Sequence, residues 1–365
     1  MSTQVITRKP SISRATTGGW VVTDFGPRRP RSLPECFFWR SNGELVMGFD
    51  DHFGGVDDEA PAEMRYMVST DEGLTWEERG VLLEMDGQIS NVGPSLLRLQ
   101  SGRVALAYMR NNDFDDLKNY IRFGDETLTN WSEPVCITPQ EGYNCATGTR
   151  LIQLRTGRLL YPVAFIEREY HEGKDRVGAY ISHVWYSDDE GQTWTRNRVH
   201  AEFPGGNPKH RGAMEPCVVE LKDGRVLMFT RTQLGAIYQS FSSDGGETWS
   251  EHQPTMLESP ETCPFITRIP STGDLLAMWN HSKFDPHHPM FGIRRPMSVA
   301  ISRDDGVTWG DSISLETDPQ FTYAMPVATF NDRWAIFGYY RAHGIQWAGH
   351  LQCMVNRMRI EDLYR

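Results

Sequence analysis

Residues that can bind an anion and move protons recur at the ends of a repeated hairpin. Glu215 and Arg231 lie at the two ends of one such hairpin, and Arg295 and Tyr323 lie in neighbouring stretches. An arginine guanidinium offers parallel N–H groups to a carboxylate. A tyrosine hydroxyl becomes a nucleophile when a carboxylate such as Glu215 accepts its proton. This combination predicts a site for an anionic ligand rather than an ordinary apolar core.

The hairpin that positions these residues occurs six times. Each copy has two apolar runs around a turn, and the turns contain Gly43, Gly102, Gly157, Gly224, Gly273 and, in the last copy, Asn331-Asp332. Asn-Gly, Ser-Gly, Thr-Gly and Asp-Gly turns between apolar runs are typical of β-hairpins. Six copies at a spacing of about 60 residues predict six blades of a radial array.

A second motif, S-x-D-x-G-x-T-W, supports the same architecture. Intact copies occupy Ser69–Trp76, Ser187–Trp194, Ser242–Trp249 and Ser302–Trp309, and a degenerate copy occupies Gly124–Trp131. The aspartates at positions 71, 125, 189, 244 and 304 are separated by 54, 64, 55 and 60 residues. The Asp can accept backbone N–H bonds, the Gly can adopt positive φ, and the Trp can cap the hairpin. Because all copies share one role, we interpret them as structural turns.

The two repeats together predict an all-β fold: a six-bladed β-propeller with four-stranded antiparallel blades. Residues 1–365 form a single domain in this prediction, with 1–17 as an N-terminal extension. The run Trp20–Phe25 is expected to pair with the last blade. Both turns of each blade lie on one face, so the opposite face carries the starts of the A strands and the ends of the B strands. The candidates on that face are Glu35, Asp50, Arg110, Glu215, Arg231, Asn280, Tyr323 and Tyr340-Arg341, with Arg295 at a C-strand start.

The S-x-D-x-G-x-T-W motif resembles the Asp-box (BNR) repeat of sialidases and their relatives. EPCVVELKDGRVLMFTR, RRPMSVAISRDDGVTW and TYAMPVATF resemble family stretches that carry catalytic residues. The resemblance implies a Tyr323 nucleophile, a Glu215 base, and Arg231 and Arg295 in a carboxylate-binding cluster, with Arg294 as the alternative to Arg295. It places the general acid in the loop after the first blade's B strand, where Asp51, Asp58 and Glu59 qualify.

A tyrosine nucleophile suits sialic acid, because the sugar carries a carboxylate on its anomeric carbon that would repel Asp or Glu. The resemblance therefore implies an exo-acting glycoside hydrolase for a terminal acidic sugar. Glu35, Arg110 and Asn280 are further candidates for substrate contacts.

The chain departs from the family at the start of the first A strand. The family has Arg-Ile-Pro there, whereas this chain has Leu33-Pro34-Glu35-Cys36. We therefore expect the carboxylate cluster to lack one arginine, for which Arg110 or Arg341 are possible substitutes. A lyase or hydrolase acting on uronate glycans, or a non-catalytic glycan-binding propeller, are the alternative interpretations.

The amino-acid composition limits the kinds of binding partner that we expect. The net charge is −11, which favours neither nucleic acid nor an anionic membrane as a partner. The six cysteines form no C-x-x-C pair, so we expect no metal and no cofactor. The N-terminal residues lack an apolar signal segment, and the expectation is a cytoplasmic protein unless a signal has been removed.

Overall fold

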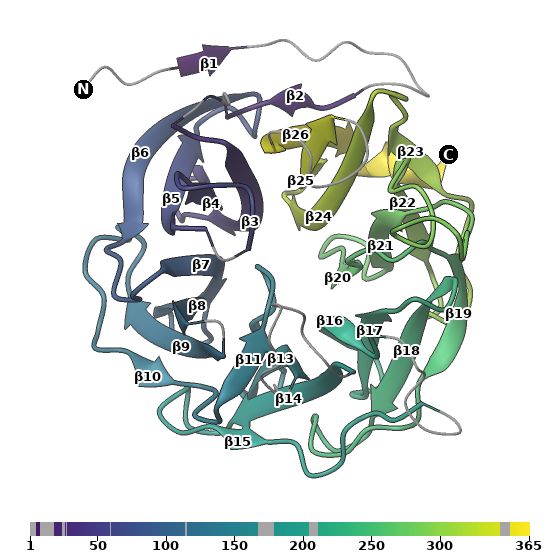
Figure 1. The fold of residues 1–365 in the computed structure, drawn as a ribbon, viewed down its shortest axis with the longest axis horizontal. Coiled ribbons are helices and arrows are strands. Elements are labelled where there is room, and N and C mark those ends of the chain that lie inside the picture. The colour runs from purple at the N-terminus through teal and green to yellow at the C-terminus, as the bar shows by residue number, and fades with distance from the viewer. Residues whose placement is uncertain are drawn as a thin grey trace.

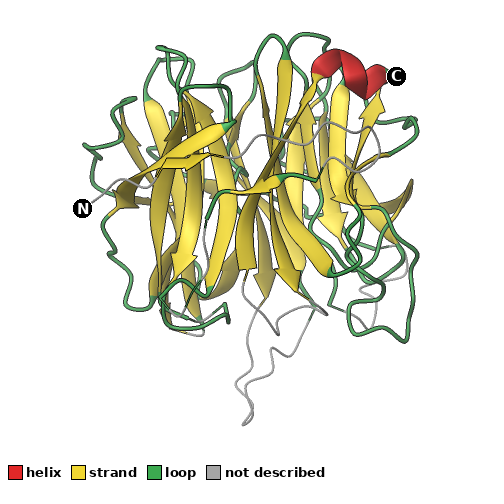
Figure 2. Cartoon of the chain, turned by 90° about the horizontal axis from the view of Figure 1, so that it is seen from above, coloured by secondary structure: helices red, strands yellow, loops and turns green. Residues whose placement is uncertain are grey.

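Six small antiparallel sheets surround a central axis in the computed structural model (Figure 1). The structure describes residues 5–7, 18–23, 26, 28–58, 60–113, 115–166, 179–203, 211–343 and 351–365. Its strands run between two opposite faces, and the short 3-10 helix η1 (Ile360–Tyr364) lies at one of them (Figure 2). This arrangement confirms the predicted all-β, six-bladed propeller.

The blades follow one another along the chain. Consecutive strands within a blade pair antiparallel, except that in blade three β11 and β12 both pair with β13. Blade one comprises β3 (Arg31–Trp39), β4 (Leu45–His52), β5 (Ala62–Ser69) and β6 (Thr75–Leu83). Blade two comprises β7 (Ser90–Arg98), β8 (Val104–Asp113), β9 (Asp116–Gly124) and β10 (Val135–Cys136). Blade three comprises β11 (Gly142–Cys145), β12 (Ile152–Gln153), β13 (Leu159–Ile166), β14 (Ile181–Ser187) and β15 (Thr195–Arg196).

The second half of the ring repeats this order. Blade four comprises β16 (Met214–Glu220), β17 (Val226–Arg231), β18 (Ala236–Ser242) and β19 (Gln253–Glu258). Blade five comprises β20 (Phe265–Arg268), β21 (Leu275–Asn280), β22 (Met297–Ser302) and β23 (Ile313–Glu316). Blade six comprises β24 (Phe321–Phe330), β25 (Trp334–His343), β26 (Leu351–Arg359) and the N-terminal strand β2 (Trp20–Val21).

The ring is closed by strands from both ends of the chain. In β2, Trp20 pairs with Val355 of β26 and Val21 pairs with Met354, which confirms the predicted closure for this part of Trp20–Phe25. Asp24 and Phe25 lie outside the described residues. Within the predicted extension 1–17, β1 (Val5–Thr7) pairs with β6 and adds a strand to the outer edge of blade one.

The hairpin turns adopt the backbone that their sequences predict. Gly43, Gly102, Gly157, Gly224 and Gly273 have φ between +73° and +94°, a region that an L side chain rarely adopts. These turns lie on the face that carries η1, since Ile360 donates its backbone N–H to the carbonyl of Arg333 in the last turn. The starts of the A strands therefore lie on the opposite face.

Each intact Asp-box holds its turn with the same hydrogen bonds. The carboxylate of Asp244 accepts bonds from the hydroxyls of Ser242 (2.8 Å) and Thr248 (2.6 Å) and from the backbone N–H of Thr248 (2.9 Å). Trp249 donates its indole N–H to Gly246 and packs in a core cluster with Val184 of blade three and Met228 of blade four. The motif therefore joins a turn to the interface between blades, in agreement with its predicted structural role.

We expect Asp244→Ala to lower the free energy of unfolding by about 1–3 kcal/mol, because buried donors of the turn lose their acceptor. Chemical denaturation with urea measures this change. The exposed Asp311 provides the matched control, and Asp311→Ala should change stability by less than about 0.5 kcal/mol. Equal effects of the two substitutions would contradict the structural role of the motif.

Candidate active site

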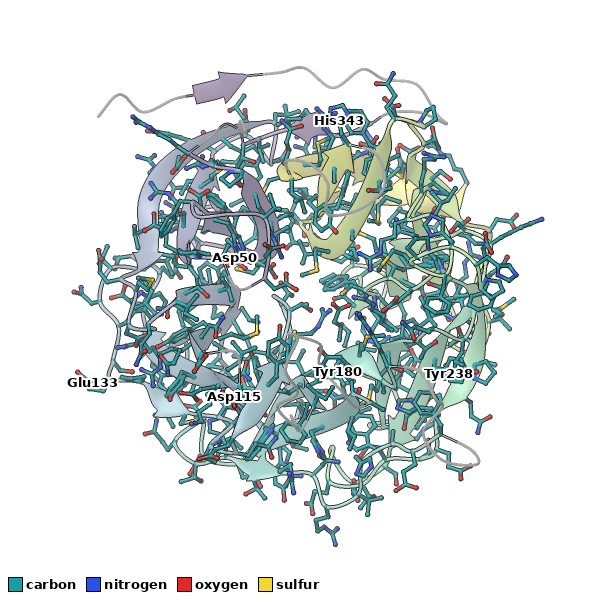
Figure 3. The ribbon with its side chains drawn as sticks, in the orientation of Figure 1. Asp50, Asp115, Glu133, Tyr180, Tyr238 and His343 are labelled. Atoms are coloured by element: carbon teal, nitrogen blue, oxygen red, sulfur yellow. The ribbon has the colours of Figure 1, made fainter. Side chains whose placement is uncertain are left out.

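A pocket of about 160 Å³ opens at the propeller axis, on the face opposite the hairpin turns. Figure 3 shows Asp50 and Tyr180, both of which line it, beside the axis, whereas Glu133 lies at the outer rim. All six blades contribute side chains to the wall, among them Arg31, Met109, Thr147, Arg231, Arg294 and Tyr340. The pocket is thus formed by strand ends that the propeller brings together from distant parts of the sequence.

Three buried arginines from three blades line this pocket. Arg31 begins β3 in blade one, Arg231 ends β17 in blade four, and Arg294 precedes β22 in blade five. Their exposed fractions are 7%, 9% and 4%. Arginine stays protonated even when buried, so the wall carries a fixed positive charge. Such a cluster is suited to binding a carboxylate or another planar anion.

Arg231 is held between two carboxylates. It donates to Glu215 Oε1 at 2.8 Å and to Glu261 Oε1 at 2.9 Å. Burial alone would raise the pKa of Glu261, but the charges of Arg231, Arg294 and Arg211 and a hydrogen bond with Gln233 together lower it. Glu215 Oε2 is buried and accepts no hydrogen bond within the described chain. The structure therefore brings the predicted residues Glu215 and Arg231 together, with one carboxylate oxygen of Glu215 unsatisfied.

Blade one contributes an arginine to the pocket, Arg31, which was not among the candidates from the sequence. Arg31 Nη2 donates to Asp58 Oδ1 at 2.7 Å, and Nη1 donates to the carbonyl of Val56. Arg31, Leu33 and Glu35 all line the pocket, as alternate residues of a strand share one face. This period of two is the sequence signal that identifies Arg31. Neither suggested substitute lines the pocket: Arg110 pairs with Asp86 and covers the Tyr120 ring, and Arg341 donates to Gln352.

Of the two adjacent arginines in blade five, Arg294 and not Arg295 lines the pocket. Arg294 Nε donates to the carbonyl of Glu261 at 2.9 Å, and the Glu261 side chain accepts from Arg231. Arg295 turns away and donates to the carbonyl of Pro319 at 2.6 Å. The preference for Arg295 is therefore corrected, since consecutive residues in extended chain point to opposite sides.

Tyr323 also lies outside the pocket. Its side chain is 1% exposed and packs in the core against Phe321 and Tyr339. Tyr323 pairs with Arg341, which also lies outside the pocket, whereas the next pair, Ala324 and Tyr340, lines it, as alternation in a strand requires. A β-bulge between Ala324 and Val327 then interrupts the alternation. Ala324 and Met325 line the pocket in its place.

The bulge in blade six corresponds to one in blade four. There β16 is irregular between Met214 and Cys217, and Glu215 has φ of +46°. Met325 has φ of +54° at the equivalent point of β24. Met325 therefore occupies the position in blade six that is equivalent to that of Glu215 in blade four. The blade-six tyrosine that reaches the pocket is Tyr340 of β25, which sequence reasoning placed on this face without giving it a role. Its phenol interacts electrostatically with Arg31 and Arg294.

The three candidates for the general acid differ in their position relative to the pocket. Asp58 lines the pocket, and its side chain is 41% exposed. Asp51 turns away and accepts from Arg29 Nε at 2.9 Å, as part of a network with Glu78. Glu59 lies outside the described residues. Asp58 is thus the candidate that the structure places at the site.

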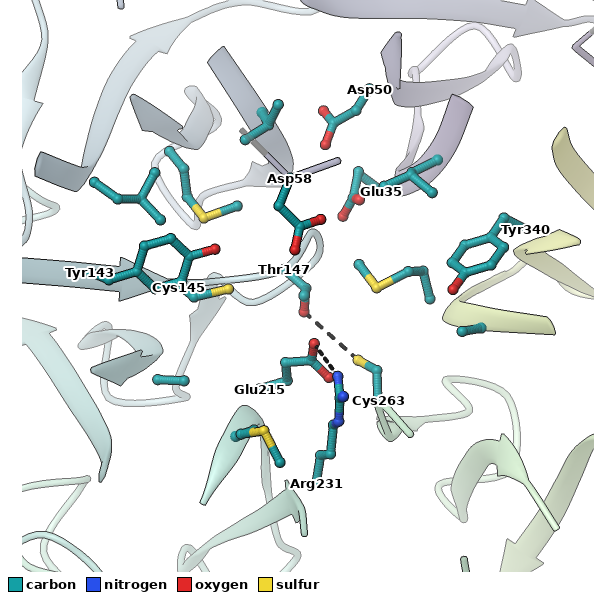
Figure 4. Close-up of a pocket in the computed structure, with 18 of the residues that line it drawn as sticks. Glu35, Asp50, Asp58, Tyr143, Cys145, Thr147, Glu215, Arg231, Cys263 and Tyr340 are labelled. Atoms are coloured by element: carbon teal, nitrogen blue, oxygen red, sulfur yellow. Dashed lines mark hydrogen bonds and ion pairs between the residues drawn. The ribbon is translucent and has the colours of Figure 1, made fainter. Parts of the chain in front are cut away.

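Two more carboxyl groups line the wall beside Asp58, namely Glu35 and Asp50 (Figure 4). Burial raises the pKa of Glu35 to about 7, and burial together with the neighbouring Glu35 raises the pKa of Asp50 well above its usual range. Asn280 is fully buried, accepts from Thr262 at 2.5 Å and does not line the pocket. Among the described residues, no three His, Cys, Asp or Glu side chains are grouped as metal ligands.

The six-bladed ring with Asp-box turns agrees with a sialidase-like protein, as comparisons with known proteins show. A family model described as a BNR repeat-like domain matches residues 92–333, which is more than half of the chain. The chain therefore belongs to the BNR repeat-like family.

Curated relatives agree with this assignment. A sialidase of Paraclostridium sordellii is 26% identical over 242 residues, which cover 59% of this chain and 56% of the relative. A sialidase of Micromonospora viridifaciens is 28% identical over 237 residues, which cover 57% of this chain and 34% of the relative. The matches span little more than half the length of the first relative and about a third of the second.

Solved structures share the fold over nearly the whole chain. The leech intramolecular trans-sialidase superposes with a TM-score of 0.72 at 17% identity and covers 95% of this chain and 71% of its own. The intramolecular trans-sialidase of Ruminococcus gnavus gives 0.69 at 17% identity, with 97% and 98% covered. A protein of unknown function from Dyadobacter fermentans gives 0.70 at 18% identity, with 93% and 97% covered. At these identities the likeness concerns the fold alone.

None of the described helices is long and apolar enough to span a membrane.

Proposed function

We propose that this protein is a glycoside hydrolase that removes a terminal acidic sugar, either sialic acid or a related sugar acid. The observation that carries the proposal is the convergence of Arg31, Arg231 and Arg294 in one axial pocket. Three fixed cations in a small, buried site favour a ligand with a carboxylate. The sialidase relatives supply the reaction class by similarity.

The proposed mechanism begins with the arginines, which hold the sugar carboxylate and so fix the anomeric carbon. Tyr340 is the proposed nucleophile in place of Tyr323, because its phenol reaches the pocket and lies near Arg31 and Arg294. A phenol that stays neutral until Glu215 accepts its proton avoids the repulsion that a carboxylate nucleophile would meet.

Glu215 is the proposed general base, since its Oε2 has no hydrogen-bond partner in the described chain. Asp58 is the proposed general acid that protonates the leaving oxygen. It is the most exposed of the pocket carboxyls, so it faces the side from which an aglycone leaves toward solvent. In Figure 4, Asp58 and Glu215 lie on opposite sides of the space between the blades. A substrate placed there would have an acid on one side and a base on the other.

The test uses fluorogenic aglycones on an α-sialoside, a β-glucuronide and a neutral β-glucoside. We expect turnover of at least one acidic glycoside and none of the glucoside. Arg294→Gln should lower kcat/KM by about 100-fold through loss of a charged hydrogen-bond donor. The adjacent Arg295→Gln is the matched control and should retain activity within a few-fold. Turnover of the neutral glucoside alone, or equal losses in both variants, would contradict the proposal.

A further inference from the structure

Two carboxyl groups of blade one meet in the pocket wall behind Asp58. Glu35 comes from β3 and Asp50 from the paired strand β4, where Asp50 lies opposite Leu33. Both are almost fully buried, at 2% and 3% exposure, and the Glu35 carboxyl helps to raise the pKa of Asp50. Two carboxyl groups in one buried site repel each other when both are ionised. The arrangement is therefore an acid–carboxylate or acid–acid pair rather than two carboxylates.

Backbone groups from two other blades fix this pair. Gly93 in blade two donates its N–H to both oxygens of Asp50 at 3.0 Å. Gly148 in blade three donates its N–H to Glu35 Oε2 at 2.6 Å. A Cβ atom on Gly148 would lie 2.5 Å from that oxygen, so only glycine permits this approach. The pair is thus held rigidly where three blades meet, with both residues lining the pocket.

The surroundings determine how the pair titrates. The charged or titratable side chains that face it are Arg31 and Cys36 on β3, His52 on β4, Asp58, Arg150 and Tyr161 of blade three, Glu215 of blade four, Tyr340 on β25 and Cys353 on β26. Burial raises the pKa of Glu35 most, the two arginines oppose the rise, and the value is about 7. Burial and the nearby Glu35 both raise the pKa of Asp50 well above its usual range.

Cys36, Cys353, Tyr161 and His52 add no charge change between pH 6 and 8. Burial raises the pKa values of Cys36, Cys353 and Tyr161, so they stay neutral. Burial and Arg31 lower the pKa of His52 to about 3, so the imidazole stays neutral as well.

We propose that Glu35 and Asp50 form a proton-sharing pair that hydrogen bonds a hydroxyl or amide group of the bound acidic sugar and makes its binding sensitive to pH. The inference rests on the proposed function, since it assumes an anionic sugar in the pocket. When both carboxyl groups carry protons, the pair is uncharged and donates a hydrogen bond to the ligand. As the pH rises, Glu35 gains a negative charge that repels the ligand carboxylate and removes a donor.

The predicted effect is a fall in affinity on the alkaline side. If only the uncharged pair binds well, the dissociation constant rises about tenfold between pH 6 and pH 8 for a group that titrates near 7. Glu35→Gln keeps the shape and an N–H donor but cannot ionise. We therefore expect the dissociation constant of this variant to be the same at pH 6 and at pH 8, so that the tenfold change is lost.

The experiment is isothermal titration of the full chain with 2,3-didehydro-2-deoxy-N-acetylneuraminic acid and with glucuronic acid, from pH 5 to pH 9. The matched control is Glu316→Gln, because Glu316 is a buried carboxyl with a raised pKa that does not line the pocket. The control should keep the pH dependence of the unmodified protein. Binding that is independent of pH, or a pH dependence that survives in Glu35→Gln, would overturn the inference while leaving the proposed function intact.

Carboxyl-carbon NMR of the free protein tests the Glu35–Asp50 pair even if neither sugar binds. If neither sugar acid binds at any pH, the proposed function is wrong, and so is the proposed contact between the pair and the sugar. The NMR spectra then test only whether Glu35 and Asp50 share a proton. A glutamate resonance that titrates near pH 7 and disappears in Glu35→Gln supports the pair, and titration of Glu35 near pH 4–5 refutes it.

Discussion

Tyr340→Phe is expected to reduce kcat for the preferred acidic glycoside by about 10³-fold, because the variant retains the ring but lacks the attacking hydroxyl. KM should change little, since the arginines that bind the carboxylate are untouched. Tyr340 lines the pocket, and its phenol is near the charges of Arg31 and Arg294. Steady-state kinetics on the fluorogenic substrate measure both parameters.

Tyr323→Phe is the matched comparison in the same blade. Tyr323 is buried among Phe321 and Tyr339, so the loss of its hydroxyl should change kcat by no more than a few-fold. The reverse outcome, an inactive Tyr323→Phe and an active Tyr340→Phe, would restore the assignment based on family resemblance. It would also mean that β24 shifts its register when substrate binds.

Arg231→Met should lower the free energy of unfolding by about 3–5 kcal/mol, because it leaves two buried carboxylates without their cation. Glu261 is the more severely affected partner, since its side chain is only 2% exposed. Its pKa is lowered in the folded protein, so the pair stabilises the fold above the ordinary pKa of about 4.5 and loses this contribution on acidification. Urea denaturation at pH 7 and pH 4 measures the effect, and the deficit should shrink at the lower pH.

Two variants make this prediction specific. Arg225→Met removes an exposed arginine at the turn of the same hairpin, where it pairs with the exposed Asp223, and should cost less than about 1 kcal/mol. The double variant Arg231→Met with Glu261→Gln should recover part of the loss, because the buried charge disappears along with its partner. A stable Arg231→Met at pH 7 would contradict the buried ion-pair arrangement.

The sequence predicts the fold well because its signals are local and repeated. Six turn motifs and four Asp-boxes each specify a short hairpin, and their spacing alone determines the number of blades. Arg231 and Glu215 could be located for the same reason, since both belong to one regular hairpin, β16–β17.

The errors in the site arise where the chain departs from regular alternation. The bulge in β24 changes which side chain faces the axis, and no turn residue marks it in the sequence. Arg294 and Arg295 precede β22, so no strand periodicity indicates which of them points inward. Arg31 was recoverable, because it lies two and four residues before Leu33 and Glu35 on the same face of β3.

The most direct test of the account is a crystal structure of the protein with 2,3-didehydro-2-deoxy-N-acetylneuraminic acid. We predict that the sugar occupies the axial pocket with its carboxylate within hydrogen-bond distance of Arg31, Arg231 and Arg294. Asp58 and Glu215 should lie on opposite sides of the anomeric carbon. A sugar bound outside the pocket, or one whose carboxylate points away from the three arginines, would contradict the account.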